Sequence, residues 1–201
     1  MHSKTLPTLA VSLVVAAFAA LSAPAHADED FKFEMVRSPS LAAFPGCAPN
    51  AHATVRIEPG GAVEEMQVRV EGLPPKTDFD FFVIQVPNAP FGMSWYQGDM
   101  ESDSYGNATG KFVGRFNVET FTVAPDAAQA PVVHQGDASE NPKTAPVHQF
   151  HVGIWFGSPA TAAKAGCPST VTPFNGEHNA GIQALSTTQF DDLNGPLRQL
   201  D

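Results

Sequence analysis

The sequence predicts an all-β fold, a single antiparallel β-sandwich, with a β-barrel as the alternative arrangement. Short apolar stretches alternate with clusters of Gly, Pro, Asn and Asp, and turn signals recur about every 8–12 residues. The chain of 201 residues contains 16 Gly and 18 Pro, which disfavours long helices. One short helix is expected over 159–165, between Ser158 as N-cap and Gly166 as C-terminal cap, with long loops elsewhere.

The strands follow from the spacing of apolar residues. Residues 63–70 alternate, with Met66, Val68 and Val70 on one face, which is typical of a half-buried strand. Residues 78–86 and 147–156 are apolar on both faces and are expected to lie in the middle of a sheet. Further strands are expected at 53–57, 94–100, 111–117, 119–123 and 182–187, and a long loop at 124–146.

The N-terminus has the layout of a secretory signal peptide over residues 1–27. Lys4 precedes an apolar run over 9–21, and Ala25-His26-Ala27 is a cleavage signal. The run is shorter than the roughly 20 residues that a membrane helix needs. We therefore expect cleavage after Ala27, a mature single domain over 28–201, a secreted or periplasmic location, and no stable membrane insertion after cleavage.

Charge and cysteine content narrow the class of partner and the compartment. The chain has 11 basic and 21 acidic residues, a formal net charge of −10, and this disfavours nucleic acid as a partner because phosphate contacts need clustered Lys and Arg. The two cysteines, Cys47 and Cys167, both lie beside small residues and proline. In an oxidising compartment they are expected to form a disulfide.

Two resemblances point to the fold and to export. Leu73, Pro75 and Thr77 match the corner motif of the fibronectin type III family, with Phe79 in place of its tyrosine. This resemblance implies an immunoglobulin- or fibronectin-like sandwich. The segments 155–159, 165–168 and 172–178 resemble a group of uncharacterised exported bacterial proteins, which implies export and a single domain but no particular chemistry.

Four aromatic residues form the first candidate site. Phe91, Trp95, Tyr96 and Tyr105 occur within fifteen residues, among short polar side chains. Rings beside polar groups are typical of surfaces that bind sugars or peptides, although the same rings could pack in the core. Because strand residues alternate, Trp95 and Tyr96 should point to opposite faces, so at most one of them is expected to be exposed.

Histidines form the second candidate site, a copper or zinc centre. Its candidate ligands are His134, His148, His151, His178 and Glu177. His148 and His151 are three apart and would point to opposite faces of one strand unless the strand begins after His148. The alternative is that these are ordinary hydrogen-bonded or exposed histidines.

The acidic residues are expected to be surface charge. Residues 99–106 carry oxygen ligands at the first, third and fifth positions of a calcium loop, but Ser104 and Gly110 stand where such a loop needs Gly and Glu. A solvated turn is therefore expected, with Asn107 as an acceptor in a host that glycosylates such sites. The neighbouring pairs Glu64/Glu65 and Asp191/Asp192 should point apart and solubilise the surface.

The function that these observations favour is a non-catalytic binding module without a cofactor. Its ligand would be a small molecule, a glycan or a protein. The usual signatures of hydrolases, metalloproteases, phosphate-binding loops and redox dithiols are missing from the sequence. The alternatives are a copper- or zinc-dependent redox or hydrolytic enzyme that uses the histidines, and a structural component of the cell envelope.

Overall fold

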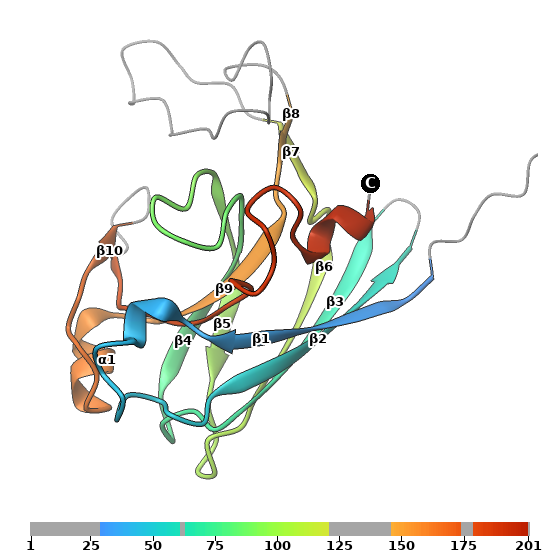
Figure 1. Ribbon diagram of the computed structural model, residues 1–201. Helices are drawn as coiled ribbons and strands as arrows, with labels where there is room; N and C mark the ends of the chain where they lie inside the picture. Colours follow the sequence, from blue (N-terminus) through green and yellow to red (C-terminus); the bar gives the residue numbers. More distant parts are fainter. Residues whose placement is uncertain (1–28, 61–62, 121–145, 174–178, 201) are drawn as a thin grey trace, which may run out of the picture.

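The computed structural model describes residues 29–60, 63–120, 146–173 and 179–200, and these form an all-β protein around one eight-stranded antiparallel sheet (Figure 1). The strands lie in the order β5-β4-β9-β12-β1-β2-β3-β6. Their bounds are β1 (Phe31–Arg37), β2 (His52–Pro59), β3 (Glu64–Glu71), β4 (Asp78–Ile84), β5 (Ser94–Glu101), β6 (Ala108–Gly114), β9 (His151–Phe156) and β12 (Gln183–Ser186).

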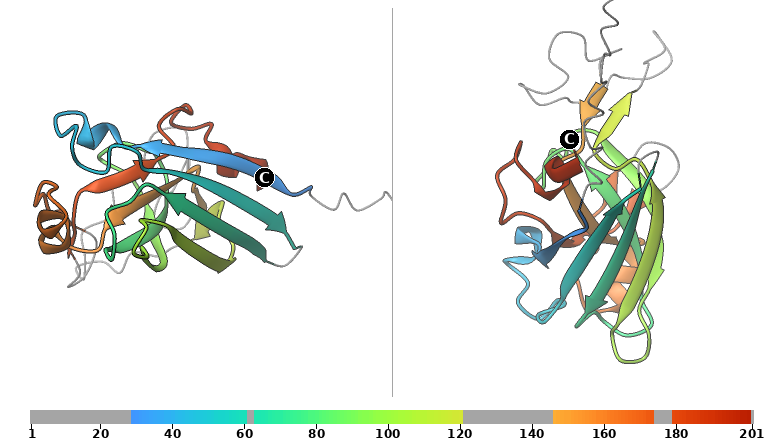
Figure 2. Two further views of the ribbon diagram at one scale, coloured as in Figure 1. Left: turned by 90° about the horizontal axis from the view of Figure 1, so that it is seen from below. Right: turned by 90° about the vertical axis from the view of Figure 1, so that its right-hand side faces the viewer.

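The sheet curls until it is close to a barrel (Figure 2). β1 connects its two halves, since residues 31–35 pair with β2 whereas Val36 and Arg37 pair with β12. The two end strands, β5 and β6, are joined by the turn at 102–107 and approach each other there. The prediction of an all-β fold is confirmed, and the sheet agrees with the barrel that the sequence leaves open as the second arrangement.

The core fills the inside of the curled sheet. Alternate residues of β4, Phe79, Phe81 and Val83, point inward and pack with alternate residues of β9 and the facing strands. The outer faces of β4 and β9 are also covered, because Phe82 and Trp155 are buried in a second, smaller cluster. This confirms that both strands are central and apolar on both faces, as the sequence predicts.

Most strands lie within a few residues of their predicted positions, but β1 and the two-residue strands β10 (Thr172–Pro173) and β11 (Asn179–Ala180) were missed, and one predicted strand is divided. β1 alternates Phe31, Phe33 and Met35 toward the core with charged residues between them, so the signal was present in the sequence. The predicted strand over 147–156 is broken at Gln149 and Phe150, between β8 (Pro146–His148) and β9. β8 pairs with β7 (Val118–Thr120) away from the main sheet.

The helix prediction is confirmed by α1 (Pro159–Lys164). The side chain of Ser158 accepts the Thr161 backbone N–H at 3.0 Å, and Gly166 ends the helix with a φ of +75°. The last small ladder, β10 (Thr172–Pro173) with β11 (Asn179–Ala180), follows α1. The predicted signal peptide at 1–27 and most of the predicted loop at 124–146 lie outside the described residues.

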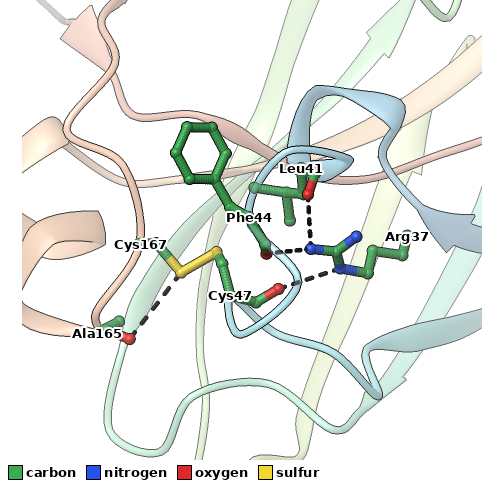
Figure 3. The surroundings of a disulfide bond; sticks show 6 residues. All are labelled: Arg37, Leu41, Phe44, Cys47, Ala165 and Cys167. Carbon is green, nitrogen blue, oxygen red and sulfur yellow. Dashed lines mark hydrogen bonds between the residues drawn. A yellow bond between two sulfur atoms is a disulfide. The ribbon is translucent and has the colours of Figure 1, made fainter.

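The predicted disulfide between Cys47 and Cys167 is confirmed. It links the segment after the 3-10 helix η1 (Pro39–Leu41) to the end of α1, with 5.0 Å between the two Cα atoms (Figure 3). Arg37 holds the same segment from its other side, since its guanidinium donates to the carbonyl oxygens of Leu41, Phe44 and Cys47 at 2.6–3.1 Å. We call this region the disulfide corner.

Candidate functional site

Trp95 and Tyr96 lie near the start of β5, the end strand of the main sheet. Trp95 is 49 % exposed and Tyr96 is 47 % exposed. Trp95 is opposite Val83, whose side chain points into the core, whereas Tyr96 is opposite Phe82, which lies in the outer cluster. The two rings therefore leave the strand on opposite faces, as alternation predicts.

The expectation that at most one of these two rings is exposed is wrong. It assumed that a strand has one wet face and one covered face. β5 is the terminal strand of the sheet, and its ladder is with β4. A side chain on the inner face of a terminal strand can reach solvent around the edge, so Trp95 is exposed although it points to the core side.

The outer face of this strand fixes the position of Tyr96. Its ring packs edge-on against Phe82, with 5.5 Å between the ring centroids, and its hydroxyl donates to Asp99 Oδ1 at 2.6 Å. Partial burial and the hydrogen bond to Asp99 raise the pKa of Tyr96 above its ordinary value, and the charges of Asp99 and Asp80 add to this. The phenol therefore stays protonated at neutral pH and acts as a donor.

Four carboxylates line the same outer face of β4 and β5. Asp78 is directly opposite Glu101, and Asp80 is directly opposite Asp99. Asp80 is only 2 % exposed, whereas the other three are exposed. Like charges directly opposite each other destabilise a sheet, which makes this arrangement unusual. Each strand shows acidic residues two apart in the sequence, but their meeting across the two strands depends on a pairing that the sequence does not state.

The other two aromatic candidates do not join Trp95 and Tyr96. The ring of Phe91 packs edge-on against Trp155, with 5.0 Å between centroids, and covers the outer cluster. Tyr105 is 86 % exposed, but it lies in the turn after Glu101, at the far end of β5 from Trp95. The four aromatic residues are close in sequence, but only Trp95 and Tyr96 lie on one part of the surface. We call the surface of Trp95, Tyr96, Asp99 and Glu101 the β5 surface.

Asp103 organises the turn that contains Tyr105. Its carboxylate accepts the backbone N–H groups of Tyr105 and Asn107 at 2.8 and 2.9 Å. The hydrogen bond from Asn107 is the main reason that the pKa of Asp103 is lowered. The carboxylate is thus used to close the turn, and Asn107 itself is exposed there.

His151 has a structural role in the described protein. It is fully buried at the start of β9, and its Nε2 donates to the carbonyl oxygens of Asp191 and Asp192 at 3.1 and 3.0 Å. Because carbonyls only accept, the proton lies on Nε2, and Nδ1 accepts from the Thr187 hydroxyl at 2.9 Å. Burial lowers the pKa of His151, so the neutral ring is favoured.

The remaining histidine candidates do not form a centre with His151. His148 ends β8 and stacks on the ring of Phe150, with 5.6 Å between centroids. His134, His178 and Glu177 lie outside the described residues. Within the described part of the chain, no three His, Cys, Asp or Glu side chains form a group that could hold a metal ion. The copper or zinc centre stays a prediction.

Glu64 corrects the expectation that the pair Glu64/Glu65 is surface charge. Glu64 points to the inner face and is only 3 % exposed. Its carboxylate accepts the backbone N–H of Phe116 at 3.0 Å and forms an ion pair with Arg115 at 2.9 Å. It borders a hollow of about 300 Å³ near the β2–β3 turn, but its oxygens are committed to these partners.

The fold and the β5 surface together define the class: an all-β, disulfide-bonded protein with aromatic and acidic side chains on its terminal strand. No protein-family model matches the chain, and the curated proteins contain no significant match to it. In the described ranges, no helix has the length and apolar character that a membrane span requires. The assignment of a function therefore depends on the geometry above.

Proposed function

We propose that this protein is an exported, non-catalytic binding module whose ligand contacts the β5 surface. The observation that carries the proposal is the half-exposure of Trp95 and Tyr96 on the terminal strand, whereas most of the other large aromatic side chains among the described residues are buried. Exposed Trp and Tyr rings beside polar groups offer a large contact area at a low entropic cost. Ligand binding would remove this apolar area from water.

The titratable groups on this surface suit recognition better than proton transfer. The Tyr96 hydroxyl is held as a donor to Asp99, and its pKa is raised, so it is a poor base at neutral pH. His151, a residue type often used as a general base, is buried on β9 away from this surface and binds backbone carbonyls and the Thr187 hydroxyl. The Tyr96 hydroxyl and the His151 imidazole are thus engaged in structural hydrogen bonds, and the faces of the Trp95 and Tyr96 rings remain available for a ligand.

Export is supported by two observations. The disulfide between Cys47 and Cys167 suits an oxidising compartment. The sequence over 1–27 has the three parts of a signal peptide, with cleavage expected after Ala27. Native mass spectrometry of protein purified from its own secretion route tests both points and would also reveal a retained ligand as added mass. A mass that retains residues 1–27 would contradict the expected cleavage.

The two tryptophans allow a direct test of the binding site. Trp155 is fully buried and Trp95 is half exposed, so acrylamide quenching of tryptophan fluorescence mainly reports Trp95. We expect a ligand found in a panel of soluble glycans and peptides to shield Trp95, and Tyr96→Ala to weaken that ligand by about tenfold or more. Tyr105→Ala is the matched control, since it removes the other exposed tyrosine. Equal affinities in the two variants, or no ligand that shields Trp95, would contradict the proposal.

A further inference from the structure

We propose that the ligand of the β5 surface is an extended, basic segment of a partner protein that pairs with β5 as an additional strand. The inference rests on the proposed function, because it names the ligand of the same surface. It follows from three features of the described residues: the faces on which the two rings lie, the position of β5 in the sheet, and the charge of its outer face.

The two rings need a ligand that reaches both faces of the sheet. Trp95 leaves β5 on the core side, opposite Val83, and Tyr96 leaves on the outer side, opposite Phe82. A flat ligand such as a sugar ring stacks on one face and would contact one of them. A peptide strand alongside β5 places alternate side chains above and below the sheet, so it contacts both rings at once.

The position of β5 allows such pairing. In the part of the chain that the structure describes, β5 forms a ladder with β4 alone, and β6 at the opposite end of the sheet approaches it at the shared turn. The side chain of Phe112 on β6 lies against Gly98, so we confine the proposed pairing to residues 94–97, where Trp95 and Tyr96 are half exposed. The Gln85 backbone N–H donates to the Met93 carbonyl oxygen, so alternation along the ladder directs the backbone groups of Ser94 and Tyr96 away from β4, where a partner strand could pair with them.

Charge selects a basic partner over a second copy of this chain. Asp99 and Glu101 lie on the outer face with Tyr96, directly opposite Asp80 and Asp78. Arg or Lys side chains on the outer face of an added strand would neutralise this row and could stack on Tyr96. Two copies joined edge to edge would bring two such rows together on chains of net charge −10.

The pattern of the partner segment follows from alternation. Its outward side chains, facing Tyr96 and the carboxylates, should be basic, and its inward side chains, facing Trp95, should be apolar. We therefore use a pool of fluorescent octapeptides in which arginine alternates with mixed valine, isoleucine and leucine. A pool with glutamate in place of arginine is the control for charge.

The first measurement is fluorescence polarisation with the full mature chain. We expect the arginine pool to bind and the glutamate pool to bind at least about tenfold more weakly. Trp95→Ala and Tyr96→Ala should each weaken the arginine pool by about tenfold, and the pair Asp99→Asn with Glu101→Gln by about three- to tenfold. Tyr105→Ala and the pair Glu34→Gln with Glu71→Gln, exposed carboxylates on the other half of the sheet, should leave it unchanged.

The second measurement tests strand pairing itself. Only alternate backbone N–H groups of an added strand point toward its neighbour, so methylating one alternate set of peptide nitrogens should abolish binding while methylating the other set should not. Hydrogen exchange of the amides over 94–97 should slow in the complex. Equal effects of the two methylated sets, or no binding of the arginine pool, would overturn the strand inference.

The outcomes separate this inference from the proposed function. If the arginine pool fails but a glycan or another ligand shields Trp95 and depends on Tyr96, the strand inference is wrong and the proposed function stands. If the arginine pool binds equally to the wild-type chain, Trp95→Ala and Tyr96→Ala, it binds elsewhere and the strand inference is wrong. The proposed function fails as well only if no ligand of the glycan and peptide panel shields Trp95. Both proposals are supported if binding requires Trp95 and Tyr96 and is abolished by methylating only one of the two alternate sets of peptide nitrogens.

Discussion

The disulfide corner and the β5 surface use their side chains in opposite ways. At the corner, one guanidinium satisfies the carbonyl oxygens of Leu41, Phe44 and Cys47, and a covalent bond ties the segment to the end of α1. On β5, large rings remain half exposed and carboxylates lie opposite carboxylates. β4, β9 and β12 separate β5 from β1 in the sheet. The polar groups of the corner are thus satisfied by structural bonds, whereas the side chains on β5 are accessible to a ligand. We expect substitutions in one region to leave the other unchanged.

Removing the disulfide should have the largest effect on stability. The bond closes a loop of 120 positions, and losing such a bond typically costs about 2–5 kcal/mol of unfolding free energy. We expect the pair Cys47→Ala with Cys167→Ala to lower the unfolding free energy measured in urea by that amount. Acrylamide quenching of Trp95 in the folded variant should stay at the wild-type level. A changed Trp95 signal would show that the two regions are coupled.

At the corner, the sequence predicts the disulfide and the helix but not β1 or the contacts of Arg37. The disulfide and the helix between Ser158 and Gly166 can be predicted from local sequence, because exported cysteines usually pair and Ser and Gly are common helix caps. The β5 surface depends on long-range pairing, which the sequence does not state. Whether Trp95 is exposed is decided by β5 lying at the end of the sheet, and the meeting of Asp80 with Asp99 depends on the register of β4 and β5, including the irregularity between Phe81 and Phe82.

Substitution of Arg37 should have the next largest effect on the unfolding free energy. Comparing Ala with Lys at this position shows whether the direction of its hydrogen bonds or its positive charge matters. Its planar guanidinium donates to three carbonyl oxygens, which a Lys ammonium cannot match in direction. We expect Arg37→Ala to cost about 2 kcal/mol in urea unfolding and Arg37→Lys to recover only part of this. Full recovery with Lys would mean that the positive charge alone holds the segment.

His151 should make stability depend on pH. Its pKa in the folded protein is below the ordinary value of 6.5, so the folded state favours the neutral ring. Its contribution is therefore complete above pH 6.5 and is lost as the pH falls from there through the folded pKa, by at most about 1.4 kcal/mol per pH unit. Urea midpoints from pH 8 to pH 5 measure this dependence.

The controls for His151 are two other substitutions. His151→Gln should be less stable at pH 8, because the contacts to the segment over 187–192 change, and it should lose this part of the pH dependence. His52→Gln alters an exposed histidine and should keep the wild-type dependence. A wild-type slope in His151→Gln would assign the pH dependence to other groups.

The bond between Tyr96 and Asp99 should affect stability least, since both side chains are exposed to solvent. We expect Asp99→Asn to change the unfolding free energy by less than about 1 kcal/mol, because water replaces much of what an exposed hydrogen bond contributes. The titration of Tyr96 is the more sensitive measurement. Its folded pKa lies above the ordinary value of 10, so the stabilisation is present below pH 10 and is lost as the pH rises through the folded pKa.

Ultraviolet titration of the phenolate should therefore show the Tyr96 pKa moving toward 10 in Asp99→Asn, since the variant removes the carboxylate charge that opposes ionisation. Tyr96→Phe identifies the transition, because it leaves Tyr105 as the remaining tyrosine of the chain. A basic peptide bound to the β5 surface should give a lower Tyr96 pKa than an uncharged peptide bound there, because both bury the ring but only the cations offset Asp99. The same Tyr96 pKa in the two saturated complexes would mean that the cations do not reach the outer face of β5.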